Sequence, residues 1–288
     1  MDYRTGVGLA VAATMLWSCQ GLIFRQIAVA DPWAILFWRS AGMVPVVAAF
    51  VIWTGGARRL HAIGAAGVVG ALGLILAFGG AVYAIQSTSI ANAVFLFSAS
   101  PFITALLGWA VLGERVRGRT WASIGVAAVG IAVMVQGGLD RGALAGNLAA
   151  LISASGFAVF TVTLRRAGLA DPMPIVLLGG VFSLIAGAGR AGAAGASLIV
   201  PVADLGWSLF MGAVTLAGGM VLYTLGSRVV PAAELTLISL LEVMLAPLLV
   251  WLVMGEGASR ATMIGGVFVL AAVLMNATGR SRAAPIPA

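Results

Sequence analysis

Ionisable groups inside long apolar stretches are the residues of this chain best suited to chemistry. Glu242 lies in the middle of the stretch 231–254, and Arg39 lies early in the stretch 33–53. A charged side chain at the bilayer centre costs roughly 2.5–3.5 kcal/mol even on insertion scales, which makes such residues functional candidates. Glu242 would either pair with a cation such as Arg39 or bind a proton, and could couple transport to protons. For Arg39 an orienting or ion-pairing role and an anchor that reaches the membrane surface both stay open.

Three further carboxylates stand at the ends of apolar stretches. Glu234 is near the start of 231–254, where a carboxylate favours the positive end of a helix, so we expect a capping role. Glu114 and Glu256 follow the stretches 89–113 and 231–254. Each could pair with the basic groups of the loop that follows, 115–119 or Arg260. We expect both to anchor their helices, with a gating role as the alternative.

Aromatic, amide and hydroxyl side chains form the second group of candidates. A pocket of rings and hydroxyls with few fixed charges suits zwitterions with apolar side chains and can also stack on cations. Pro101 removes one backbone hydrogen bond and frees the carbonyl near Phe97, which a neighbouring serine could satisfy or offer to a ligand. Aromatic rings in membrane helices more often pack against other helices or face lipid than line a cavity. Trp17 and Tyr83 are the preferred candidates among them. The predicted cavity residues are Trp17, Gln20, Tyr83, Phe95, Ser98, Ser100, Pro101, Phe157, Tyr223 and Glu242.

Ten apolar segments would position these side chains. Of the 288 residues, 61% are hydrophobic and 9% charged, whereas soluble domains have roughly 45–50% and 25%. About 20 apolar residues at 1.5 Å rise cross a hydrocarbon core of about 30 Å. We therefore expect an all-α integral membrane protein with no soluble domain. The predicted spans are 6–28, 33–53, 62–85, 89–113, 119–137, 143–164, 173–193, 203–226, 231–254 and 260–278.

The two halves of the chain repeat one pattern. Five residues of the first half, including Trp109 and Glu114, recur 142 positions later, and Asp31-Pro32 and Tyr83 recur 140 positions later. The predicted repeats are 1–138 and 139–288, which together form one membrane unit. Five helices per repeat is an odd number, so the second copy enters the membrane from the opposite side. Inverted repeats around a central cavity are typical of secondary transporters that work by alternating access.

The distribution of arginine predicts the orientation of the chain. The net charge is +7 with no lysine, but the arginines stand singly or in small groups between apolar runs, so we expect no nucleic-acid partner. With a cytoplasmic N-terminus the inner side holds eleven arginines and the outer side four, which predicts a multi-pass protein of the inner (plasma) membrane with both termini cytoplasmic. The inner set is Arg4, Arg58, Arg59, Arg115, Arg117, Arg119, Arg165, Arg166, Arg228, Arg280 and Arg282. The outer set is Arg25, Arg141, Arg190 and Arg260.

The sequence argues against enzymes of the membrane interior. Its only histidine, His61, lies in a predicted loop, and no aspartate lies deep in a predicted helix, so neither a zinc motif nor paired aspartates are present. An ATP-binding loop of the Gly-Lys type is absent because the chain has no lysine. Cys19 is the only cysteine, which rules out an internal disulfide. We expect no metal, no cofactor and no obligatory protein partner, only a small-molecule substrate and the lipid bilayer.

Several motifs together resemble those of a known family. They are Trp17, Asp31-Pro32, Arg39, Ser100-Pro101, Leu112-Gly113-Glu114, Leu241-Glu242 and Gly255-Glu256. In this combination and order the chain resembles the EamA-type, ten-helix branch of the drug/metabolite transporter superfamily, and within it the YddG-like exporters of amino acids. The resemblance implies export of small metabolites, above all neutral and aromatic amino acids, from the cytoplasm. The chain departs from the family at Val243, where a proline often follows Leu-Glu.

Two alternatives to amino-acid export stay open. The first is efflux of cationic drugs or other small metabolites by the same fold. Small four-helix exporters of the superfamily use a glutamate in their first helix, where this chain has none and carries Trp17 in that region, which weakens this alternative. The second is a non-transporting structural or receptor subunit, against which the inverted repeat argues.

Overall fold

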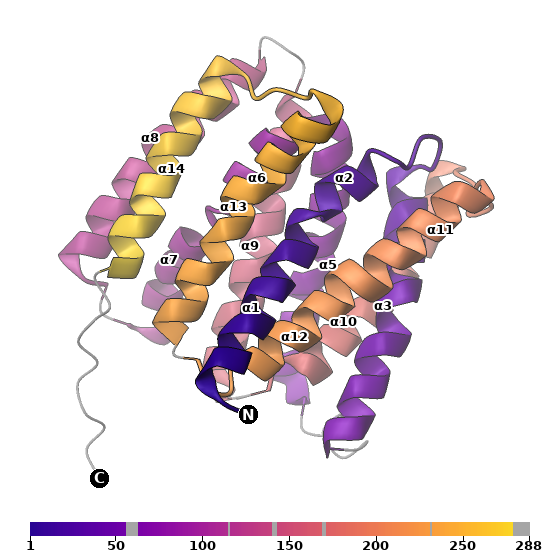
Figure 1. Ribbon diagram of the computed structural model, residues 1–288, viewed down its shortest axis with the longest axis horizontal. Coiled ribbons are helices and arrows are strands. Elements are labelled where there is room, and N and C mark those ends of the chain that lie inside the picture. Colours follow the sequence, from indigo (N-terminus) through magenta and orange to yellow (C-terminus); the bar gives the residue numbers. More distant parts are fainter. Residues whose placement is uncertain (56–62, 115, 140–142, 169–170, 231, 279–288) are drawn as a thin grey trace.

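The described part of the chain folds into helices that cross the molecule from end to end (Figure 1). The computed structural model describes residues 1–55, 63–114, 116–139, 143–168, 171–230 and 232–278, and no strand occurs among them. The first repeat comprises α1 (Tyr3–Ser18) with α2 (Gln20–Phe24), α3 (Pro32–Gly55), α5 (Gly64–Ser87), α6 (Ile90–Phe97) with α7 (Ser100–Leu112), and α8 (Gly118–Leu139). The second comprises α9 (Leu144–Arg166), α10 (Met173–Ala194), α11 (Val202–Phe210) with η1 (Met211–Gly218) and α12 (Gly219–Gly226), α13 (Ala232–Met254), and α14 (Arg260–Thr278).

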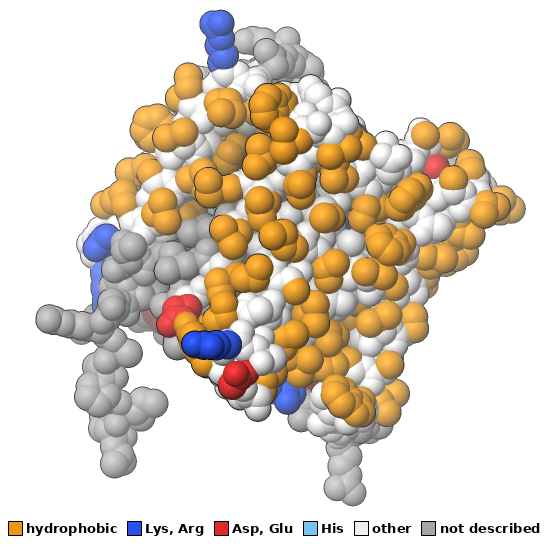
Figure 2. Space-filling model, viewed as in Figure 1, with side chains coloured by type: hydrophobic (Ala, Val, Ile, Leu, Met, Phe, Trp, Pro, Cys, Tyr) orange, Lys and Arg blue, Asp and Glu red, His pale blue; other side chains and the backbone are white. Residues whose placement is uncertain are grey.

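These elements form ten spans that coincide with the predicted segments to within a few residues. Eight spans are long and apolar enough to cross a membrane, and the apolar parts of α13 and α14 are shorter, Leu241–Met254 and Arg260–Asn276. Hydrophobic side chains cover the face shown in Figure 2, with the charged ones toward its margins. Large apolar groups such as Trp53 and Val267 are 77% and 64% exposed, which suits contact with lipid. The fold is that of a multi-pass membrane protein.

The first span ends at Phe24, four residues before the predicted end, and a carboxylate from the other repeat explains the difference. Asp204, at the start of α11, accepts hydrogen bonds from the backbone N–H groups of Ala28, Val29 and Ala30 at 3.3, 2.9 and 2.9 Å. N–H groups that point at this carboxylate cannot donate to the carbonyls of a continuing helix. Asp204 is 3% exposed, so this buried acceptor fixes the turn that leads into α3.

Three spans are irregular along their length, the first of them near its end. The first is interrupted at Cys19, between α1 and α2, and the fourth at Ser98 and Ala99, between α6 and α7. The sequence had predicted Pro101 inside one continuous helix. Pro101 instead stands in the first turn of α7. The eighth span contains the π-helical segment η1. Such segments are frequent at functional sites, because they re-aim the side chains of a helix.

Close glycine contacts hold the helices together, and some recur in both repeats. Gly226 of α12 lies against Gly6 of α1, and a Cβ added there would be 2.7 Å from the Gly6 carbonyl oxygen. Gly146 of α9, which follows Gly6 by 140 residues, lies against the carbonyl of Ser87 in α5, one residue after the position that corresponds to Gly226. Without a hydrophobic drive between helices in lipid, small residues that admit close backbones supply the packing. In Figure 1 α1, α13 and the α11–α12 span cross in front of α5, α9 and α10.

Candidate functional site

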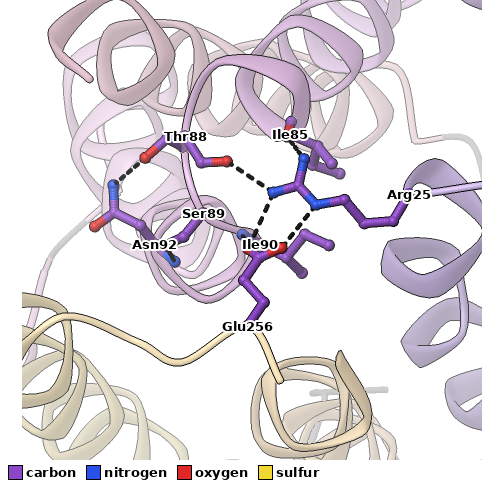
Figure 3. A network of polar contacts seen from close by, with 7 residues as sticks. All are labelled: Arg25, Ile85, Thr88, Ser89, Ile90, Asn92 and Glu256. Atoms are coloured by element: carbon purple, nitrogen blue, oxygen red, sulfur yellow. Dashed lines mark hydrogen bonds and ion pairs between the residues drawn. The ribbon is translucent and has the colours of Figure 1, made fainter. Parts of the chain in front are cut away.

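An arginine and a glutamate from different repeats fasten one end of the bundle, which we call the Glu256 end (Figure 3). Arg25, directly after α2, donates from Nε to Glu256 Oε2 at 2.7 Å and from Nη2 to Glu256 Oε1 at 3.0 Å. Its other contacts are the carbonyl oxygens of Ile85 at 3.2 Å and Thr88 at 3.3 Å. Glu256 also accepts the N–H of Ile90 at 2.9 Å. The pair thus joins α2, the end of α5, the start of α6 and the segment after α13.

The surroundings of Glu256 favour its charged form. Its side chain is 25% exposed and that of Arg25 is 29% exposed. Burial by itself raises the pKa of Glu256, but the hydrogen bonds from Arg25 and Ile90 and the positive charge of Arg25 outweigh burial, so its pKa lies below the ordinary value. The ion pair is therefore intact at neutral pH.

A second arginine–glutamate pair lies at the opposite end, which we call the Glu114 end. Arg165, in the last turn of α9, donates from Nη2 to Oε1 and Oε2 of Glu114 at 2.6 and 2.5 Å. Glu114 follows Gly113, whose left-handed φ of +67° ends α7. The span formed by α6 and α7 starts at the Glu256 end and ends just before Glu114. At a rise of 1.5 Å per residue its length separates the two ion pairs by about 30 Å. The side chains of Arg165 and Glu114 are 43% and 37% exposed.

The two ion pairs are copies of each other in the repeat. Arg165 follows Arg25 by 140 residues, and Glu256 follows Glu114 by 142, the two offsets of the sequence repeat. Each pair joins an arginine of one repeat to a glutamate of the other. Among the described residues, the partners of these glutamates are therefore not the expected Arg117, Arg119 and Arg260; Arg115 lies outside the described residues. Sequence separation misled the prediction, because the partner arrives from the other repeat.

A hollow lies beside the pair at the Glu114 end. Its volume is about 420 Å³, and it opens between the start of α5, the end of α7 and the end of α9. Apolar side chains make up most of its wall, with Thr163 and Arg166 as the polar members. Its lining residues are Ala65, Ala66, Val69, Leu107, Val111, Val159, Val162, Thr163 and Arg166.

Arg39 lies in the interior, between the two ends. It is 5% exposed, so its guanidinium does not reach the surface and the anchoring alternative is excluded. Nη2 donates to Gln20 Oε1 at 3.3 Å, and the guanidinium carbon lies 5.5 Å from the centre of the Phe78 ring. Nε and Nη1 are buried without a hydrogen-bond partner in the described part of the chain. The expected ion pair between Arg39 and Glu242 is absent from the described part of the chain. Glu242 itself is partly exposed on α13.

Trp17 and Tyr223 are the two candidate aromatic residues that the structure brings together. Their ring centres lie 5.3 Å apart, and a Cβ added at Gly219 would overlap the Trp17 indole nitrogen. That nitrogen is buried and has no partner among the described residues. Trp17 thus meets Tyr223 of the second repeat, whereas its repeat copy Phe157 stacks on Phe160 of its own helix.

The remaining cavity candidates are spread over the molecule. Tyr83 and Phe157 are 36% and 42% exposed. Phe95 is buried and packs against Gly266 of α14. Ser98 donates to the carbonyl of Val94 at 3.1 Å, one turn earlier than the carbonyl that Pro101 was expected to free. Ser100 is partly exposed and Pro101 exposed. Tyr3 donates to Glu234 in the first turn of α13, and the capping role of Glu234 stays a prediction.

Sequence reasoning missed several buried polar groups. Asn92 donates to Thr88 Oγ1 at 3.2 Å and to Asn147, and accepts from Thr262 at 3.2 Å, which ties α6 to α9 and α14. The hydroxyls of Ser183 and Ser208 are buried without a partner in the described chain. Among the amides and hydroxyls, only Gln20, Ser98 and Ser100 had been predicted to have a role. Asn92 and Asn147, each inside such a stretch, were detectable by the same cost of burial.

Comparisons with known proteins agree with this architecture. The sequence profile of the EamA-like transporter family matches residues 4–136 and again residues 142–278. A comparison with curated proteins returned no match. A solved structure described only as "Crystal structure of protein" is 18% identical, with a TM-score of 0.69 over 98% of this chain and 100% of that chain, and it shares the fold. With one profile matching each half, the chain belongs to the EamA-like transporter family and is a two-repeat membrane transporter.

Proposed function

We propose that this transporter exports amino acids, chiefly neutral and aromatic ones, from the cytoplasm by alternating access, as the YddG-like exporters that it resembles do. The observation that supports the proposal is the pair of repeat-related ion pairs at opposite ends of the bundle. In alternating access each end must close in turn around a site between the repeats. Each pair bridges the two repeats, so breaking one while keeping the other opens a single end.

The contents of the interior support a zwitterionic substrate. An indole N–H, an aromatic stack and a cationic side chain lie on the spans that meet there, at Trp17, Tyr223 and Arg39. Apolar and aromatic surface accommodates the side chain of a neutral amino acid, and the few polar groups orient its charged end.

The proposed orientation has both termini in the cytoplasm of a cell with an inner membrane. The Glu114 end then faces the cytoplasm and the Glu256 end faces outward. Six arginines that contribute to the charge count lie outside the described residues, as does His61, so the orientation rests on the sequence. Those arginines are Arg58, Arg59, Arg115, Arg141, Arg280 and Arg282.

Uptake by proteoliposomes tests the function. Purified protein would be reconstituted, and uptake of labelled threonine, methionine and tryptophan measured with and without an imposed pH gradient. We expect saturable uptake in which the three amino acids compete with each other. Glu242→Gln in the same assay tests proton coupling, because a gradient response that disappears in this variant assigns the coupling to Glu242.

The opposite result has a definite meaning. If none of the three amino acids is taken up while a labelled organic cation is, the amino-acid proposal fails and cation efflux replaces it. Protein-free liposomes supply the background. Correct folding of the sample is checked by its thermal unfolding, so that an inactive preparation is not counted against the proposal.

A further inference from the structure

The strongest unexplained feature of the interior is a charge without a counterion. Arginine stays protonated in proteins and offers five N–H donors. One nitrogen of Arg39 bonds to the Gln20 amide oxygen, and the other two have no partner in the described chain. A buried charge left unpaired costs several kcal/mol, so a chain that keeps one in its membrane interior has a use for it.

Arg25 shows how a guanidinium with a structural role is bonded in this protein. All three nitrogens of Arg25 are hydrogen-bonded, to both oxygens of Glu256 and to two backbone carbonyls. Arg25 is also more exposed than Arg39, which is 5% exposed. The more deeply buried arginine therefore has the poorer set of acceptors. A purely structural role for Arg39 would require acceptors for all of its buried nitrogens, and two of them have none in the described chain.

Other unpartnered polar groups, each able to donate a hydrogen bond, lie on the helices that pack against α3. Ser183 lies on the face of α10 that carries Gly180 and Gly187, and these glycines contact Met43 and Phe37 of α3, on either side of Arg39. Ser208 lies one turn before Gly212, where α3 crosses the eighth span. Their hydroxyls and the Trp17 indole N–H are buried without partners in the described chain. The helices that pack against α3 thus hold N–H and O–H groups that can still donate hydrogen bonds to a ligand.

The local backbone gives the same indication. The interruption of the first span at Cys19 falls next to Gln20, whose amide holds Arg39. The π-helical segment η1 contains Gly212, where a Cβ would overlap the Arg39 carbonyl oxygen. Two of the three irregular spans therefore meet at this one arginine. Irregular backbone near the middle of a transporter helix, as in η1, lines the substrate site in other inverted-repeat folds.

We propose that Arg39 is the binding site for the carboxylate of the transported substrate, with Gln20 as the residue that positions its guanidinium. A carboxylate supplies two acceptor oxygens in the plane of the fork, which matches the free Nε and the second N–H of Nη2, the same two nitrogens that Arg25 presents to Glu256. Phe78 covers one face of the guanidinium and leaves its edge for the ligand. The inference rests on the proposed function in that the ligand is a transport substrate, and it adds which group of the substrate the protein recognises.

Ligand-induced stabilisation tests the inference on the purified full chain without relying on transport. The thermal unfolding midpoint rises with ligand concentration according to affinity. L-methionine and L-tryptophan would be titrated beside their methyl esters, which keep the side chain and amine but lose the anionic charge. We expect the esters to bind about ten- to a hundredfold more weakly, the loss that follows from a missing charge-assisted hydrogen bond.

Two variants locate the effect at Arg39. Arg39→Gln removes the charge and should abolish the difference between acid and ester. Gln20→Glu leaves Arg39 in place but gives it an internal carboxylate, so the variant should unfold at a higher temperature and lose its response to free acids. Arg190→Gln is the matched control, because Arg190 also lies over an aromatic ring, 5.0 Å from the centre of Trp33, but is exposed. It should keep the acid preference.

Each outcome separates this inference from the proposed function. Equal stabilisation by acid and ester, or an acid preference that survives in Arg39→Gln, overturns the carboxylate site and leaves amino-acid transport standing. Binding of 3-phenylpropanoate but not of amino acids, lost in Arg39→Gln, supports the site and removes amino acids as the substrate. If no carboxylate stabilises the wild-type protein, the inference is wrong.

Discussion

The two ends of the bundle carry the same ion pair in different surroundings. At the Glu256 end the pair is 25–29% exposed and is held by two carbonyl oxygens and one backbone N–H (Figure 3). At the Glu114 end the pair is 37–43% exposed, and within the described part of the chain Arg165 donates to Glu114 alone. Related sequences thus form one tight and one loose ion pair.

The difference shows how a duplicated chain adopts an asymmetric conformation. Burial and backbone hydrogen bonds strengthen an ion pair, whereas an exposed pair contributes about 0–1 kcal/mol. The ion pair at the Glu256 end is therefore the stronger one, and the pair at the Glu114 end, with a hollow of about 420 Å³ beside it, is more weakly held. Under the proposed mechanism the opposite conformation has the tight pair at the Glu114 end.

The largest expected effect comes from Glu256→Gln. The variant leaves Arg25 charged, with no carboxylate to neutralise it. We expect the free energy of unfolding to fall by about 1–2 kcal/mol, a value between those for exposed and for buried ion pairs. The unfolding midpoint measured in nanodiscs checks this. A change no larger than that of Glu114→Gln would contradict the distinction between a tight and a loose end.

The pH dependence of stability sharpens the same comparison. The pKa of Glu256 is lower in the folded protein than in the unfolded chain, where it is about 4.3, so its contribution is complete above that pH and is lost as the pH falls through the folded value. The stability difference between wild type and Glu256→Gln should therefore shrink as the pH is lowered from about 6 to 3. Thermal unfolding across this range measures it, and a difference that grows on acidification would be the wrong sign.

The smallest expected effect comes from Glu114→Gln. Both partners of this pair are more than a third exposed, so solvent screens their attraction. We expect the free energy of unfolding to fall by at most about 0.5–1 kcal/mol. Added salt should weaken the wild-type pair toward the variant. The unfolding midpoint in low and high salt tests this, and a loss equal to that of Glu256→Gln would show that exposure does not set the strength of these pairs.

The fold could be predicted from the sequence because its causes are local. The lengths of the apolar stretches and the repeat offsets of 140 and 142 gave ten spans in two copies. The first span was predicted too long because its end is set by Asp204, which lies 174 residues from Ala30. The interruption before Pro101 was seen only as a missing hydrogen bond, since a proline does not tell whether a helix bends or restarts.

The candidate site could be predicted only in part. Arg39 and Trp17 stood out by type and depth, but the partner of Arg39 is an amide and not the expected Glu242. Glu114 and Glu256 were noted as helix ends, but their arginines come from the other repeat. Both failures have one cause: apolar periodicity gives the order of helices along the chain, and which faces meet depends on packing between helices.

Locking each end separately tests alternating access most directly. In a Cys19→Ser background, Arg25→Cys with Glu256→Cys would be cross-linked by a short bifunctional thiol reagent, and Arg165→Cys with Glu114→Cys likewise. Single-cysteine variants treated in the same way are the controls. The account predicts that either cross-link stops uptake by proteoliposomes and that cleaving the reagent restores it. Undiminished uptake with either end fully cross-linked would contradict the claim that both ends must open in turn.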